Sequence, residues 1–331
     1  MSGGVDSSVA AALLKNQGYD VYGVTLKLTD GDLSFIDDAA AVCDILNIPF
    51  TVVDFRDKFK KYVKEAFVSE FKSGRTPNPC VICNKMIKFG ALFDYALDNG
   101  FDYVATGHYA KIKNQNGVYS LFTAESREKD QTYFLYALTQ EKLSKILMPL
   151  GEYDKDSVRE LAREFNLPVW KKKDSQDICF IPKGDKNAYL KKFLDDAPGD
   201  FLDTAGNVIG KHNGIFNYTY GQRKGLGAFG KPMFVLSINP DNNSITLGES
   251  GQEFSKSFMI EDVNLMADLG ESFTCSCKVR YSTNSLPCSV VRVGENLKVT
   301  LLSPARSITP GQACVFYDGE RLLGGGTIVT R

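Results

Sequence analysis

The chain has 331 residues, of which 43% are hydrophobic and 24% are charged, a composition typical of a globular protein with two or three domains. Its formal net charge of −1 excludes a global basic field, although local lysine and arginine clusters stay compatible with a nucleic-acid partner. No apolar run approaches the ~20 residues of a membrane span, and the N-terminus lacks the order of a secretory signal. We therefore predict a cytoplasmic protein whose eight cysteines stay reduced.

Strand and helix patterns alternate from residue 1 to residue 186. The stretch from Ser7 to Gln17 has apolar residues at helical spacing and is followed by Gly18, a common helix end. Apolar strands are predicted over 21–28, 50–55 and 103–107, and further helices over 36–46, 59–67 and 158–165. This repeated order predicts an α/β fold with a parallel, doubly wound sheet.

The pattern changes twice after residue 186. Residues 187–248 are rich in glycine turns and include a predicted hairpin around NPDNN. Residues 249–331 read as all-β, with a hairpin turn at Asp318-Gly319, and predict a small barrel or sandwich. Cys275 and Cys277 lie two apart in an alternating strand, so both face one side, which we expect to be the core. A zinc site completed by two further cysteines of this region, Cys288 and Cys314, is the less favoured alternative.

A glycine-rich turn precedes the first helix, with the sequence SGGVDSS over residues 2–8. Glycines let backbone N–H groups crowd around an anion, and the helix N-terminus adds a partial positive charge. Asp6 is a candidate ligand for Mg²⁺ or a support for the turn itself. The Gly-Lys-Ser/Thr ending of a Walker loop is absent. The turn is predicted to bind phosphates, and an ordinary turn before a helix is the alternative.

Two later stretches, TPNPCVICNK over 76–85 and DSQDICFIP over 174–182, carry candidate reactive cysteines. Cys83 is predicted near a helix N-terminus, which favours its thiolate and a role as nucleophile. The Cys80-x-x-Cys83 spacing equally fits half of a zinc site or a redox pair. Cys179 reads either as a packed core thiol or as a loop thiol near an anionic partner.

Several motifs occur together in a recognisable order. SGGVDSS resembles the pyrophosphate loop of the PP-loop ATP pyrophosphatases. With it occur TPNPCVICNK, ATGHYA (105–110), KDQTYFLY (129–136), DSQDICFIP, GQRKGLG (221–227), KVRYS (278–282) and TPGQACVFY (309–317). This order closely resembles the tRNA-specific 2-thiouridylases over essentially the whole chain. The resemblance implies a PP-loop ATP-binding catalytic domain over 1–186, a small central tRNA-binding domain over 187–248 and a C-terminal β-barrel over 249–331.

The resemblance also implies a reaction and the residues that perform it. ATP would adenylate the C2 oxygen of the wobble uridine in tRNAs of the Lys, Glu and Gln type, and sulfur from a cysteine persulfide would replace it, releasing AMP and pyrophosphate. Cys179 would carry the persulfide, and Cys83 would be the partner nucleophile, with a transient Cys83–Cys179 disulfide. ATP would be bound by Ser2, Gly3, Gly4, Val5, Asp6, Ser7, Ser8, Leu26 and Gly107. Contacts with tRNA would come from Asn78, Pro79, Cys80, His108, Lys129, Asp130, Gln131, Arg280, Tyr281 and Gln312.

The resemblance further implies ATP with Mg²⁺ as the nucleotide, tRNA as the substrate, and a cysteine desulfurase or sulfur-relay protein as the sulfur donor. Cys80 departs from the family, because many members have aspartate there as a candidate general base. Our hypothesis is that Cys80 is a spare thiol that traps or relays sulfur. An iron–sulfur cluster on Cys80, Cys83 and Cys179 is a less favoured alternative, and no other metal site is predicted.

Two rival functions remain open from the sequence: another PP-loop adenylating ligase or amidotransferase, and an inactive RNA-binding relative. A second expectation concerns the start of the chain. Family members place an apolar strand before the phosphate-binding turn, whereas only Met1 precedes it here. We expect the natural chain to begin upstream, so that restoring the apolar segment would raise stability and ATP affinity.

Overall fold

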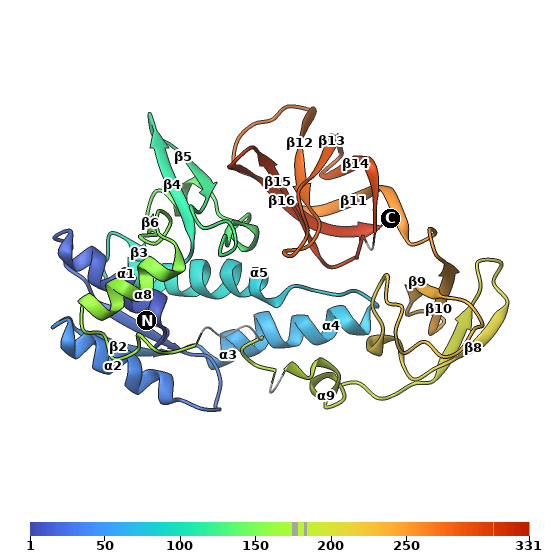
Figure 1. The fold of residues 1–331 in the computed structure, drawn as a ribbon, viewed down its shortest axis with the longest axis horizontal. Coiled ribbons are helices and arrows are strands. Elements are labelled where there is room, and N and C mark those ends of the chain that lie inside the picture. Colours follow the sequence, from blue (N-terminus) through green and yellow to red (C-terminus); the bar gives the residue numbers. More distant parts are fainter. Residues whose placement is uncertain (174–177, 182–183, 307, 331) are drawn as a thin grey trace. The chain divides into compact units, whose positions relative to one another are not determined.

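The computed structural model describes residues 1–173, 178–181, 184–306 and 308–330. The chain forms two compact units that are each discontinuous in sequence (Figure 1). The first unit contains Met1–Val63, the described part of 80–176, and Gly319–Leu323. The second contains Lys64–Pro79, the described part of 177–318, and the C-terminal strand from Gly324 onward.

The first unit has the alternating strand and helix order that the sequence predicts. Its first half contains α1 (Val5–Asn16), β1 (Gly23–Lys27), α2 (Ser34–Ile45), β2 (Phe50–Asp54) and α3 (Arg56–Phe59). Its second half contains α6 (Leu92–Asp98), β3 (Val104–Ala105), β4 (Ala110–Gln115), β5 (Val118–Thr123), α7 (Gln140–Leu143), β6 (Ile146–Leu147) and α8 (Lys155–Glu164). β1 pairs with β2 and β3 pairs with β6, each in parallel, as an α/β fold requires.

Packing of α1 against α8 forms one core cluster of the first unit. Val9 and Ala12 of α1 are fully buried, as are Val158 and Ala162 of α8, and Leu167 completes the cluster. These residues recur at three- and four-residue spacing, so each helix presents one apolar face. The N-terminus of α1, which carries the glycine-rich turn, is therefore held on a packed helix rather than on a free loop.

Two stretches of the helical chain are π-helical, which the sequence did not predict. η1 (Lys60–Glu65) separates α3 from α4 (Ala66–Lys72), and η2 (Asn84–Ala91) separates α5 (Pro79–Cys83) from α6. The wider π-helical turn is often found at functional sites. η2 begins directly after Cys83, so it follows the candidate nucleophile in the chain.

The middle of the second unit is a small sheet of four strands in the order β8-β7-β10-β9. Its elements are α9 (Lys186–Leu190), β7 (Gly199–Leu202), β8 (Val208–His212), β9 (Met233–Asn239) and β10 (Ser244–Glu249), with short 3₁₀ turns at Ile215–Asn217 here and Thr132–Phe134 in the first unit. The predicted hairpin around NPDNN is confirmed, because β9 and β10 pair antiparallel across it. Buried Phe201, Val235 and Leu247 form its core.

The C-terminal part of the second unit closes into a barrel. It contains β11 (Phe254–Leu265), β12 (Ser272–Lys278), β13 (Leu286–Val293), β14 (Asn296–Arg306), β15 (Ala313–Asp318) and β16 (Arg321–Thr330). The strand order is β11-β14-β13-β12-β15-β16, and β11 also pairs with β16, which closes the ring. The predicted fold class, an α/β PP-loop domain with a small central domain and a C-terminal β-barrel, is confirmed.

Candidate functional site

The glycine-rich turn adopts a conformation that only glycine tolerates well. Gly3 has a φ of +65°, in the left-handed region, and a Cβ there would lie 2.3 Å from the carbonyl oxygen of Phe35. Gly4 is the N-cap of α1, and no side chain caps the backbone N–H groups of the first turn. These amides form the positive end of a 12-residue helix, so the turn has the features of an anion-binding site.

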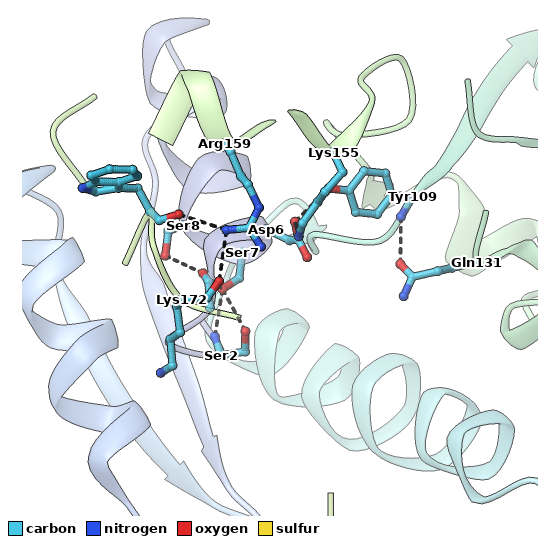
Figure 2. A network of polar contacts seen from close by, with 11 residues as sticks. Ser2, Asp6, Ser7, Ser8, Tyr109, Gln131, Lys155, Arg159 and Lys172 are labelled. Atoms are coloured by element: carbon cyan, nitrogen blue, oxygen red, sulfur yellow. Dashed lines mark hydrogen bonds and ion pairs between the residues drawn. The ribbon is translucent and has the colours of Figure 1, made fainter. Parts of the chain in front are cut away.

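The serines of the turn have two different roles (Figure 2). The Ser7 hydroxyl accepts a hydrogen bond from the Ser2 backbone N–H at 3.0 Å and lies 3.0 Å from the Ser2 hydroxyl. Ser8 is fully buried and donates to the Gly4 carbonyl at 2.8 Å. Ser2 and Ser7 therefore line the outer side of the turn, whereas Ser8 supports it from within, together with buried Val5.

Gly107 lies directly against the turn. A Cβ at this position would lie 2.7 Å from the carbonyl carbon of Asp6 and 2.8 Å from the backbone nitrogen of Ser7. The segment after β3 thus approaches the turn so closely that any side chain would displace it. Leu26, the second residue assigned to nucleotide contact, is half-buried in β1 and pairs with Val53 of β2.

Asp6 is held by two side chains that the sequence did not single out. Lys155, at the start of α8, forms an ion pair with the Asp6 carboxylate at 2.7 Å, and the Tyr109 hydroxyl donates to the same oxygen at 2.8 Å (Figure 2). The Lys155 side chain is only 13% exposed. This arrangement supports the turn and places a half-buried cation beside it. A carboxylate is a ligand type that Mg²⁺ prefers, so Asp6 stays the candidate magnesium ligand.

A second lysine approaches the turn from the segment after α8. Lys172 donates to the Gly3 carbonyl at 2.9 Å and forms an ion pair with Asp38 of α2. Arg159 of α8 orients this segment by donating to the carbonyls of Trp170 at 3.0 Å and Lys172 at 3.1 Å. Two ammonium groups therefore flank the turn, and charged donors of this kind form strong hydrogen bonds with phosphate oxygens.

The candidate nucleophile and its neighbour differ in exposure. Cys80 is exposed and Cys83 is half-buried, both within the short helix α5. Although Cys80 reaches the surface, the protein around it desolvates the thiolate, which raises the pKa of Cys80, and nearby Lys88 partly offsets this. A general-base role for Cys80 is disfavoured by this shift, because little thiolate forms at neutral pH.

Cys179 is exposed, whereas the two residues that follow it in the chain pack into the interior. Phe180 and Ile181 are buried, and the Phe180 ring lies 5.5 Å from Phe67 and 5.3 Å from Tyr189 in edge-on contacts. The rest of the DSQDICFIP stretch, residues 174–177 and 182, lies outside the described residues. Cys83 belongs to the first unit and Cys179 to the second. All eight cysteines lie within the described residues.

The residues assigned to tRNA in the first unit are mostly engaged in internal contacts. His108 is 6% exposed, its Nδ1 lies 2.8 Å from the Thr106 hydroxyl, and desolvation by burial lowers its pKa well below the ordinary value. The buried Asp130 carboxylate accepts from the Ala124 backbone N–H at 3.1 Å. Gln131 accepts from the backbone N–H of Tyr109 at 3.0 Å, whereas Lys129 is half-buried.

In the second unit, Gln312 donates to the Thr76 carbonyl at 2.7 Å, so it holds the segment that carries half-buried Asn78 and buried Pro79. Arg280 donates to the Thr309 hydroxyl, and the neighbouring Tyr281 is 40% exposed. The contacts of these residues with tRNA stay predictions.

Two negative findings apply to the residues that the structure describes. No group of three or more histidine, cysteine, aspartate or glutamate side chains there is arranged to hold a metal ion. No helix in the described ranges is long and apolar enough to span a membrane.

Comparison with known proteins gives a consistent result over the whole chain. Residues 1–183 match a family model described as the tRNA methyl transferase HUP domain, residues 187–249 a tRNA methyl transferase PRC-barrel domain, and residues 255–328 an aminomethyltransferase beta-barrel domain. The chain is 47% identical over 352 residues to the tRNA-specific 2-thiouridylase MnmA of Carboxydothermus hydrogenoformans, covering 100% of this chain and 96% of that protein. It is 49% identical over 347 residues to the protein of the same name from Clostridioides difficile, covering 99% and 96%.

Proposed function

Since the chain belongs to the family of tRNA-specific 2-thiouridylases, we propose that it replaces the C2 oxygen of the wobble uridine of tRNA by sulfur in an ATP-dependent reaction. The observation that supports this most directly is the turn over residues 2–8. It combines an uncapped helix N-terminus, a glycine with positive φ and no room for a Cβ, and two lysines. These are the features that bind the phosphates of a nucleotide.

In the first step of the proposed reaction, the uridine C2 oxygen attacks the α-phosphorus of ATP and pyrophosphate leaves. The backbone N–H groups at the start of α1 bind the phosphates, and Ser2 and Ser7 add hydroxyl donors. Lys155 and Lys172 offset the charge that builds up on the departing pyrophosphate. Mg²⁺, which ATP normally carries, would supply further charge neutralisation, with Asp6 as the candidate protein ligand.

In the second step, sulfur replaces the adenylated oxygen. A persulfide on Cys179 attacks C2, a carbon–sulfur bond forms, and the bond from C2 to the oxygen of AMP breaks. The Cys83 thiolate then attacks the Cys179 sulfur, which cleaves the sulfur–sulfur bond, leaves sulfur on the base and forms a Cys83–Cys179 disulfide. An external thiol reduces this disulfide before the next cycle.

The proposed substrates and partners follow from the same chemistry. The target base must leave its stack to reach both the nucleotide and the cysteines, which loop bases of RNA do at modest cost. We propose tRNAs of the Lys, Glu and Gln type as substrates. A cysteine desulfurase or sulfur-relay protein would load Cys179, because the reaction consumes one sulfur atom in each cycle.

A thiolation assay on tRNA tests the proposal against its rivals. With ATP, tRNA and a persulfide donor, the wild-type chain should form 2-thiouridine, and Cys179→Ser and Cys83→Ser should not. Both variants should still release pyrophosphate in the presence of tRNA, because adenylation precedes sulfur transfer. The control Cys43→Ala replaces a fully buried thiol in α2 and should keep both activities.

Two outcomes would contradict the proposal. Binding of tRNA without any tRNA-dependent pyrophosphate release would favour an RNA-binding relative without activity. Pyrophosphate release that depends on a small carboxylate substrate and ammonia, and not on tRNA, would favour a PP-loop ligase.

A further inference from the structure

Four cysteines that the proposed reaction does not use gather inside the C-terminal barrel. Cys275 and Cys277 lie on β12, Cys288 on β13 and Cys314 on β15. Three of them are buried, and Cys275 is half-buried. As the alternation of β12 predicted, Cys275 and Cys277 face the same side of the strand.

The strand register brings two of these thiols together. Cys275 is directly opposite Cys288 in the antiparallel β12–β13 pair, and their sulfur atoms are 3.5 Å apart. Side chains directly opposite each other on neighbouring strands have Cβ atoms about 4.5–5.5 Å apart, close to the range that a disulfide spans. The sulfurs must approach by only about 1.5 Å to reach bonding distance, which rotation of the two side chains can supply.

We infer that Cys275 and Cys288 form a site of reversible thiol oxidation, in which a peroxide converts the two thiols to a cross-strand disulfide. The inference is independent of the proposed function. A zinc site at these cysteines is not supported, because no metal-holding group occurs among the described residues. A disulfide needs only the pair that the register already aligns.

Hydrogen peroxide accepts the two electrons that the pair of thiols loses when the disulfide forms. One thiolate attacks a peroxide oxygen, which forms a sulfenic acid and releases hydroxide. The second sulfur attacks the sulfenic sulfur, so a sulfur–sulfur bond forms, the sulfur–oxygen bond breaks and water leaves. In total, two thiols lose two protons and two electrons, and one hydrogen peroxide becomes two waters.

The electrostatics of the cluster favour this step. Hydrogen bonds with Cys275 and Cys277 lower the pKa of Cys288 below its ordinary value. The same bonds, together with desolvation, raise the pKa of Cys275 and Cys277 well above the ordinary value. The thiolate is the reactive form of cysteine, and half-buried Cys275 gives the pair its access to the surface.

The test uses the full chain, reduced and then treated with hydrogen peroxide. Remaining thiols are blocked with an alkylating agent, and the unreduced digest is mapped by mass spectrometry. We expect a peptide pair cross-linked through Cys275 and Cys288, which a dithiol reductant separates. Cys275→Ser and Cys288→Ser should each remove it, whereas the matched control Cys314→Ala should keep it.

A second measurement does not depend on these variants. The oxidised wild-type chain should melt several degrees higher than the reduced chain, and reduction should abolish the shift, because a cross-link restricts the unfolded state. The inference is overturned if Cys275 and Cys288 remain alkylatable under peroxide that oxidises exposed Cys179, or if either pairs mainly with a different cysteine. An unchanged melting temperature after complete cross-linking would overturn the claim that the disulfide fits the native barrel.

Discussion

Replacing Gly107 by alanine would place a methyl group against the backbone of the glycine-rich turn over residues 2–8. The new Cβ would lie 2.7 Å from the Asp6 carbonyl carbon and 2.8 Å from the Ser7 nitrogen, whereas ordinary contacts begin near 3.4 Å. The two segments must therefore separate by about 0.6–0.7 Å. Both neighbours are backbone atoms at the start of α1, so no side chain can rotate to relieve the contact.

The magnitude follows from overpacking. Forcing a methyl group into a closed contact costs about 1–3 kcal/mol. For a unit of this size, that corresponds to a melting temperature lower by roughly 2–12 °C. Displacement of the Ser7 amide should also weaken ATP binding about tenfold, the equivalent of one hydrogen bond.

Thermal unfolding and equilibrium binding of ATP measure the two effects separately. Gly31→Ala is the matched control, because its Cβ would have only the Thr29 hydroxyl, at 3.9 Å, as a near neighbour. It should melt and bind ATP as the wild type does. If Gly107→Ala also behaved as the wild type in both assays, the close approach of this segment to the turn would be refuted.

Three further predictions concern titratable side chains near the site. Lys155→Met should lower tRNA-dependent pyrophosphate release about tenfold to a hundredfold, because a charged hydrogen bond to Asp6 and a cation beside the phosphates are lost, and Lys155→Arg should recover part of it. The pKa of Cys80 is raised, so its alkylation, monitored by mass spectrometry, should be slower at pH 7 than that of cysteine in solution and should speed up as the pH rises. Equal alkylation rates at pH 7 would contradict the raised pKa. The free energy of unfolding should fall by up to about 1.4 kcal/mol per pH unit below pH ~6.5, because the unfolded state binds a proton that buried His108 excludes. In His108→Phe, the free energy of unfolding, measured by denaturant titration at a series of pH values, should depend less steeply on pH.

The conformation of the glycine-rich turn was predictable from the sequence because its determinants are local. Glycines, serines and the start of a helix lie within seven residues, so the pattern alone indicates the conformation. The ion pair of Lys155 with Asp6 was not predictable, because the two residues are 149 positions apart and meet only through the packing of α8 on α1. Nothing in the sequence around Lys155 distinguishes it from any exposed lysine of a helix.

Two structural features were missed for different reasons. The β4–β5 hairpin is signalled in the sequence by the dipeptide Asn116-Gly117, which favours a tight hairpin turn. Both residues have positive φ values in the structure, +53° and +83°. The π-helical segment after Cys83 has no comparable signal, because a wider turn is imposed by tertiary packing rather than by local preference. Burial of His108 likewise depends on neighbours distant in the sequence.

The discontinuity of the two units has a consequence for synthesis on the ribosome. The first unit includes Gly319–Leu323, where Arg321 pairs with Phe122 of β5, so this strand contact is made by residues translated long after β5. The second unit includes Lys64–Pro79, which are translated early and cannot pack until the rest of that unit has been synthesised. Domains usually fold one after another as they emerge. Here each unit needs a segment that lies within or beyond the other in the chain, so the two units cannot fold one after the other.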